Sequence, residues 1–177
     1  MKNLIKILLK IFGTGVMIGL SACSASVVIN PDPDQVSSTA SAIADFDLPA
    51  GYHADLSTNL MGYDVTAYSR GSGPNHLYLI QSKKESDGEK LAQVLDEMVV
   101  GSGDPQTRIT VIETRSVTVR GQETTLVISD CVNSEGLAYR QAVVAFQGNG
   151  GPALLVFSEP NESWDLDMVD TLLASVH

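Results

Sequence analysis

The sequence predicts an α+β domain with a mostly antiparallel sheet and two helices packed on it. Runs of apolar residues at alternate positions between residues 60 and 146 are typical of strands. The segments that follow Ser86 and Ser163 instead place apolar residues at helical spacing. Clusters of Gly, Pro and Asn separate these runs, so we expect the order β-β-α-β-β-β-β-α.

The first half of the domain should contain a hairpin followed by a helix. A turn over residues 47–52 opens the domain, and strands over 60–69 and 76–81 are predicted to pair. Residues 86–89 have the Ser-x-x-Glu form of a capping box. A helix should follow with one apolar stripe, made of Leu91, Val94, Leu95 and Met98.

The second half should add four strands, over residues 107–120, 124–129, 137–146 and 153–157. The last of these is apolar at every position, which is typical of a strand in the centre of a sheet that is covered on both faces. The Gly-rich segment 148–151 is followed by this strand and not by a helix. It therefore predicts a tight turn and not a phosphate-binding loop.

The sequence closes with a second predicted helix, which Ser163 could cap. Asp165 and Asp167 would lie near its positive amino end, which explains them better than a calcium site with Asp170 does. Its buried face should consist of Met168, Val169, Leu172, Leu173 and Val176.

Residues 1–22 have the layout of a secretory signal peptide. Three lysines precede an apolar run over 11–20, and small residues end the segment. The run is shorter than the roughly 20 apolar residues of a membrane-spanning helix. An uncleaved spanning or amphipathic segment remains the alternative interpretation.

Leu20-Ser21-Ala22-Cys23 resembles the lipobox of bacterial lipoproteins. The resemblance implies cleavage between Ala22 and Cys23 and a lipid, such as diacylglycerol with palmitate, on the Cys23 sulfur. Two or three acyl chains anchor a protein stably, whereas one is marginal. Ser24 follows, where lipoproteins retained in an inner membrane often carry aspartate. We therefore expect an outer membrane, facing the periplasm, or otherwise the outer face of a plasma membrane.

Charge and composition constrain the mature chain. The signal carries three of the 11 basic residues and none of the 21 acidic ones, so its removal takes the net charge from −10 to −13. Such a surface repels nucleic acid, and we expect no nucleic-acid partner. Residues 23–44, with Pro31, Pro33 and many serines, predict a disordered tether, which leaves 45–177 as one domain.

No set of residues predicts catalysis, a cofactor or a metal ion. The histidines are His53, His76 and His177, and only His76 adjoins a predicted strand. A hydrolase that pairs His76 with Cys131 is conceivable, but no nucleophile motif supports it. Cys131 has no intramolecular partner once Cys23 is lipidated, so it is a buried apolar residue or forms an intermolecular disulfide.

Several aromatic residues could line a groove on the sheet, although packing in the core and in cross-strand pairs is the preferred explanation. They are Tyr52, Tyr63, Tyr68, Tyr78, Tyr139 and Trp164.

The predicted order, together with Leu48-Pro49-Ala50-Gly51-Tyr52, resembles the PsbP/Mog1-like domains of some exported lipoproteins over residues 46–177. The resemblance implies an assembly or binding domain and transfers no functional residue. We therefore expect a lipid-anchored, non-catalytic domain that binds an envelope protein. The alternative is a carrier of an apolar small molecule held between the sheet and the helices, and a hydrolase is third.

Overall fold

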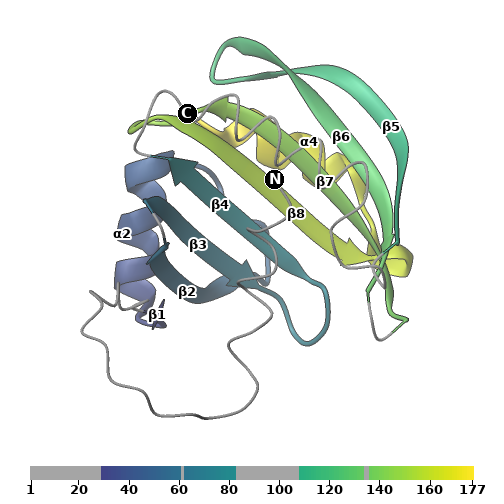
Figure 1. The fold of residues 1–177 in the computed structure, drawn as a ribbon, viewed down its shortest axis with the longest axis horizontal. Helices are drawn as coiled ribbons and strands as arrows, with labels where there is room; N and C mark the ends of the chain where they lie inside the picture. The colour runs from purple at the N-terminus through teal and green to yellow at the C-terminus, as the bar shows by residue number, and fades with distance from the viewer. Residues whose placement is uncertain (1–28, 61, 83–107, 134–135) are drawn as a thin grey trace, which may run out of the picture.

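The computed structural model describes residues 29–60, 62–82, 108–133 and 136–177. Eight strands form one antiparallel sheet in the order β1-β2-β3-β4-β8-β7-β6-β5, and helices α2 and α4 pack on it (Figure 1). The predicted α+β class is therefore confirmed. No helix among these described residues is long and apolar enough to cross a membrane.

The elements have the following bounds. The strands are β1 (Ile29–Asn30), β2 (His53–Leu60), β3 (Tyr63–Ser69), β4 (His76–Ser82), β5 (Arg108–Val119), β6 (Gln122–Val132), β7 (Ala138–Gln147) and β8 (Pro152–Pro160). The helices are α2 (Pro33–Ile43), the short 3-10 helix η2 (Asn161–Ser163) and α4 (Leu166–Ser175).

Strand β8 lies between β4 and β7 in the middle of the sheet, as its apolar sequence predicts. Successive residues of a strand point to opposite faces, so β8 supplies side chains to both. Leu155 and Phe157 join the large core under α2 and α4, which we call the helix face. Leu154 and Val156 belong to a smaller apolar cluster on the second face of the sheet. The two-faced strand is thus the centre of both clusters.

The predicted tether over residues 23–44 is wrong for its second half, because α2 occupies Pro33–Ile43. The Asp32 side chain caps α2 by accepting a hydrogen bond from the Asp34 N–H, and Pro33 takes the first helical position, where proline is favourable. Val36 and Ile43 are fully buried in the helix-face core. The prolines and serines therefore mark the start and the exposed side of a helix.

Other boundaries also differ from the prediction. The predicted opening turn is followed at once by a strand, β2, and then by Gly62, whose φ of 91° suits the reversal into β3. The cap of α4 is Asp165, which accepts hydrogen bonds from the Asp167 and Met168 N–H groups, while Ser163 lies in η2. The predicted helix after Ser86 lies outside the described residues.

Backbone hydrogen bonds tie the end of α2 and the residues that follow it to two other parts of the chain. The backbones of Asp45 and His177 exchange hydrogen bonds of 3.1 and 2.9 Å, which joins the end of α2 to the end of the chain. Asn149, in the turn between β7 and β8, donates from its backbone N–H to the Ile43 carbonyl at 2.7 Å. A Cβ on the neighbouring Gly148 would come within 3.0 Å of that same carbonyl. The glycine-rich turn is therefore a docking point for α2.

We expect Ile43→Ala to reduce the free energy of unfolding by about 2–5 kcal/mol, because a fully buried side chain leaves a cavity in the core. Ser38→Ala is the matched control, since Ser38 lies on the exposed side of α2 and its change should stay within about 0.5 kcal/mol. Urea unfolding of both variants measures the difference. Equal stability of the two variants would show that α2 does not contribute to the folded core.

Candidate functional site

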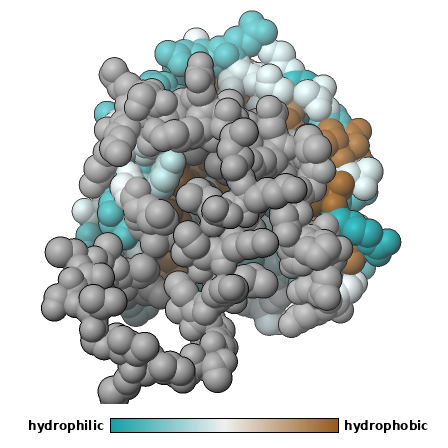
Figure 2. Space-filling view, in the orientation of Figure 1, coloured by the Kyte–Doolittle hydropathy of each residue, from teal (hydrophilic) through white to brown (hydrophobic). Residues whose placement is uncertain are grey.

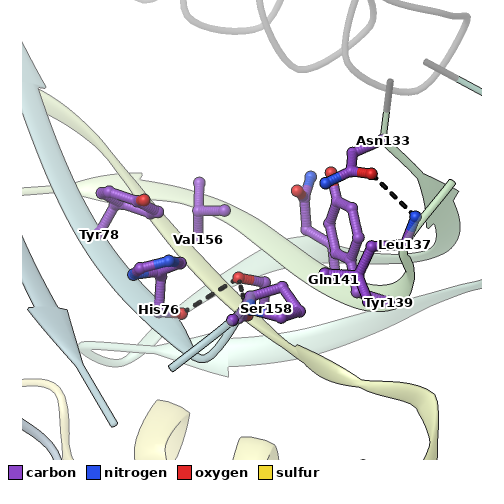
Figure 3. A pocket seen from close by; sticks show the side chains of 10 residues that line it. His76, Tyr78, Asn133, Leu137, Tyr139, Gln141, Val156 and Ser158 are labelled. Atoms are coloured by element: carbon purple, nitrogen blue, oxygen red, sulfur yellow. Dashed lines mark hydrogen bonds between the residues drawn. The ribbon is translucent and has the colours of Figure 1, made fainter. Parts of the chain in front are cut away.

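A pocket of about 360 Å³ lies on the second face of the sheet and spans the ends of β4, β8 and β7. We call it the sheet pocket. In Figure 3, His76 and Tyr78 stand at one end of the pocket and Tyr139 and Gln141 at the other. The lining residues are Gly73, Pro74, His76, Tyr78, Asn133, Leu137, Tyr139, Gln141, Val156 and Ser158.

A row of polar residues crosses the sheet at the pocket. Strand register places His76 beside Ser158, Ser158 beside Gln141, and Gln141 beside Ser129. Gln141 and Ser158 are 8% and 5% exposed. The next row towards the other end of β8, from Tyr78 through Val156 to Val143, is aromatic and apolar. The pocket therefore lies where the second face changes from apolar to polar. Burying the polar groups there costs free energy unless they form hydrogen bonds.

Hydrogen-bonded turns hold both rims of the pocket. In the loop between β3 and β4, the Arg70 N–H donates to the Asn75 carbonyl at 3.1 Å, and the Ser158 hydroxyl donates to the Pro74 carbonyl at 2.8 Å. Across the pocket, the Leu137 N–H donates to the Asn133 side-chain oxygen at 2.9 Å. These contacts give the pocket fixed walls on two loops as well as a floor of three strands.

His76 brings an unsatisfied polar atom into the sheet pocket. Its ring Nδ1 is buried and has no hydrogen-bond partner in the part of the chain that the structure describes. The ring packs beside Tyr78, with the ring centroids 5.5 Å apart. More than nine in ten buried polar groups in proteins have a partner, so an atom of this kind needs an explanation, and a bound water or ligand is one. The described residues hold four other such atoms, and of the five only the His76 nitrogen belongs to a residue that lines the sheet pocket.

The sequence analysis considered a hydrolase in which His76 pairs with Cys131. The structure places these two residues on strands that are far apart within the sheet. Cys131 is on β6, three strand spacings from β4, which is about 14 Å. That is beyond the reach of direct proton transfer. Ser158 is the cross-strand neighbour of His76, but its hydroxyl donates to the carbonyls of Pro74 and, at 3.5 Å, His76. Its hydroxyl proton is therefore not directed at the His76 ring.

Cys131 is buried, with 1% of its surface exposed, as the interpretation of it as a buried apolar residue expects. Burial raises the pKa of its thiol to about 11. The neighbouring Tyr139 hydroxyl lies in the sheet pocket, and burial, with smaller contributions from Cys131 and Tyr78, raises its pKa to about 12. Both groups are therefore neutral near pH 7.

The other residues considered from sequence have structural roles. His53 is the first residue of β2, and the His177 ring nitrogen contacts the Ser175 carbonyl. Asp165 caps α4, and Asp170 forms an ion pair with Arg115 of β5. No cluster of three metal-ligating side chains occurs in the described parts of the chain. Ala22 and Cys23 lie outside the described residues.

The aromatic residues divide between the two faces of the sheet. Tyr52, Tyr68 and Trp164 pack in the helix-face core. Tyr63 and Tyr78 border the smaller cluster on the second face, and Tyr139 lies beyond it in the sheet pocket. Only the tyrosines of the second face could therefore contribute to one groove, because the sheet separates them from the others.

Glu159 directly follows Ser158 and lies on the helix face, where it is fully buried. The Arg70 guanidinium forms an ion pair with its carboxylate, and the Tyr52 hydroxyl donates to the same oxygen at 2.9 Å. Burial and the neighbouring carboxylate raise the pKa of Tyr52 above its ordinary value. This cluster fixes the base of the loop that carries Pro74, so it supports the pocket from behind.

Sequence reasoning identified His76 and the tyrosines as candidates but missed Gln141 and Ser158. The sequence signal for these two residues was a polar residue inside an otherwise apolar strand, at a position that the alternation of side chains assigns to a buried face.

No family model matches this chain, and no curated protein was found to be similar to it.

Stability should fall as the pH rises above 9. The Cys131 thiol has an ordinary pKa of 9.0 and a folded pKa of about 11, so the unfolded chain loses this proton at lower pH than the folded chain. The stabilisation is complete below pH 9 and is lost as the pH rises towards 11; Tyr139 adds a similar loss between pH 10 and about 12. Thermal unfolding between pH 8 and 11 measures the slope.

Cys131→Ala should flatten the decline between pH 9 and 11 relative to the unmodified chain. A variant with the same slope as the unmodified chain would show that the thiol is not responsible.

Proposed function

We propose that this chain is a lipid-anchored binding domain of a bacterial envelope that acts without catalysis, and that its partner or ligand occupies the sheet pocket. The observation that carries the proposal is the polar row of His76, Ser158 and Gln141, in which Ser158 and Gln141 are buried and the buried ring nitrogen of His76 is unsatisfied. Burying polar groups is unfavourable for folding alone, so a site of this kind is more useful for recognition than for stability.

The anchor in this proposal is the lipid on Cys23, at an outer membrane or the outer face of a plasma membrane. Ile29, the first described residue of the sheet, comes only six positions after Cys23 in the sequence. Even a fully extended segment of that length reaches about 20 Å. With Cys23 lipidated, β1 would therefore be held close to the membrane surface, and a partner at the membrane would be within reach.

A second hollow bears on the alternative function, a carrier of an apolar molecule between the sheet and the helices. It measures about 200 Å³ and lies beside α2, where Phe46 meets Tyr68 edge to face. Pockets for small molecules usually measure about 300–1,000 Å³. The larger sheet pocket on the opposite face therefore supports recognition of a polar group better than transport of an apolar one.

Lipidation is tested by growing bacteria that produce the chain with radiolabelled palmitate. We expect label in the unmodified chain and none in Cys23→Ala, because the thioether needs that sulfur. Cys131→Ala is the matched control and should keep full labelling, since it removes the only other cysteine. Label that persists in Cys23→Ala would refute the proposed anchor.

Binding is tested by native mass spectrometry of the full chain extracted from membranes in mild detergent. We expect a mass excess that disappears on denaturation and that falls at least about tenfold in occupancy in Gln141→Ala, which removes a buried hydrogen-bonding group. Gln147→Ala is the control, because Gln147 is an exposed residue of β7 outside the pocket. A chain that carries no ligand or partner under any growth condition would count against the proposal.

A further inference from the structure

The described residues that line the sheet pocket include no Asp, Glu, Lys or Arg. This is informative in a chain with 21 acidic and 11 basic residues. A bound ion would lose its hydration in the pocket without gaining a counter-charge, which is costly. The described part of the lining therefore favours an uncharged ligand.

The pocket offers both donors and acceptors of hydrogen bonds. Gln141 has a carboxamide that can do both, and the Tyr78 hydroxyl can likewise donate or accept, whereas the Tyr139 hydroxyl is already hydrogen-bonded to Cys131. The buried Nδ1 of His76 adds one further position. Figure 3 shows Gln141 and Tyr139 side by side, extending away from the sheet, with Tyr78 and His76 across from them. A ligand with several hydroxyl or amide groups would satisfy these positions together.

Apolar surface is interleaved with these polar groups. The Tyr78 ring lies beside the His76 ring at an interplanar angle of 34°, and Val156, Pro74 and Leu137 complete the apolar part of the lining. Aromatic rings with polar tips suit ligands that have both an apolar face and a polar edge. A sugar ring has this character, since its C–H groups form a face and its hydroxyls surround it.

We propose that the sheet pocket binds an uncharged sugar unit. The inference rests on the proposed binding function and names its ligand class. The volume of about 360 Å³ lies at the lower end of the range for small-molecule sites, so the pocket fits one or two rings and not a long chain. Val111 and Ile112 of β5 are exposed apolar residues that do not line the pocket. Figure 2 shows apolar (brown) atoms at its right-hand edge, the side on which Figure 1 places β5.

The test is saturation-transfer NMR with the full chain in a detergent that has no sugar head group. The probes are methyl β-glucoside and N-acetylglucosamine, compared with glucuronic acid and glucosamine, which have similar rings and carry a charge. We expect transfer to the neutral sugars and at least about tenfold weaker binding of the charged ones. Tyr78→Phe should weaken binding of the neutral sugars about tenfold by removing one hydroxyl.

Tyr63→Phe is the matched control for that variant, because Tyr63 lies on the same face outside the pocket. It should bind as the unmodified chain does. The Tyr78→Phe change keeps the ring, so loss of binding with unchanged thermal unfolding reports on the hydroxyl and not on folding.

Two results would overturn the sugar inference while leaving the proposed function in place. One is a ligand of another class, charged or apolar, found by native mass spectrometry and displaced by Gln141→Ala. The other is equal binding of neutral and charged sugars in the pocket. The absence of transfer to any probe, together with a chain that carries no bound mass, would overturn both proposals.

Discussion

Strand β8 is hydrogen-bonded along both edges, to β4 and to β7, and this position constrains the rest of the molecule. A strand in such a position has no freedom to rotate, so each of its residues must face one side of the sheet or the other. Leu155 and Phe157 meet the helices, while Leu154 and Val156 face away from them. Every neighbouring strand must match this alternation, because its side chains share the same two faces.

The constraint also explains why the two polar clusters lie back to back. Ser158 and Glu159 are consecutive residues of β8, so one faces the sheet pocket and the other the helix face. The Oε1 atom of Glu159 is paired with Arg70 and Tyr52, while its buried Oε2 has no hydrogen-bond partner among the described residues. The polar row that includes Ser158 retains an unsatisfied nitrogen on His76. The two clusters differ in that His76 and Ser158 line the sheet pocket, whereas Glu159 does not, and our proposal of a binding site rests on that difference.

Helix α2 connects the fold to the proposed anchor. Its burial through Val36 and Ile43 draws the chain into the domain much earlier than a flexible tether would allow. Hydrogen bonds from Asn149 to the Ile43 carbonyl, and between Asp45 and His177, then join this helix to the turn after β7 and to the end of the chain. In our proposal the short remaining link to Cys23 would keep the domain near the membrane, as a domain that binds an envelope component requires.

The sequence by itself determined the α+β class, the strands over the second half and the central place of β8, because periodicity and a continuous apolar run are local properties. It did not determine α2, since serines and prolines fit both a tether and the exposed side of a helix; Val36 and Ile43 are informative only once a core exists for them to enter. Nor could it assemble the pocket, because His76 of β4 is far in the chain from Gln141 and Ser158, which lie on the consecutive strands β7 and β8. Strand order and register decide which side chains become neighbours, and both are set by tertiary packing.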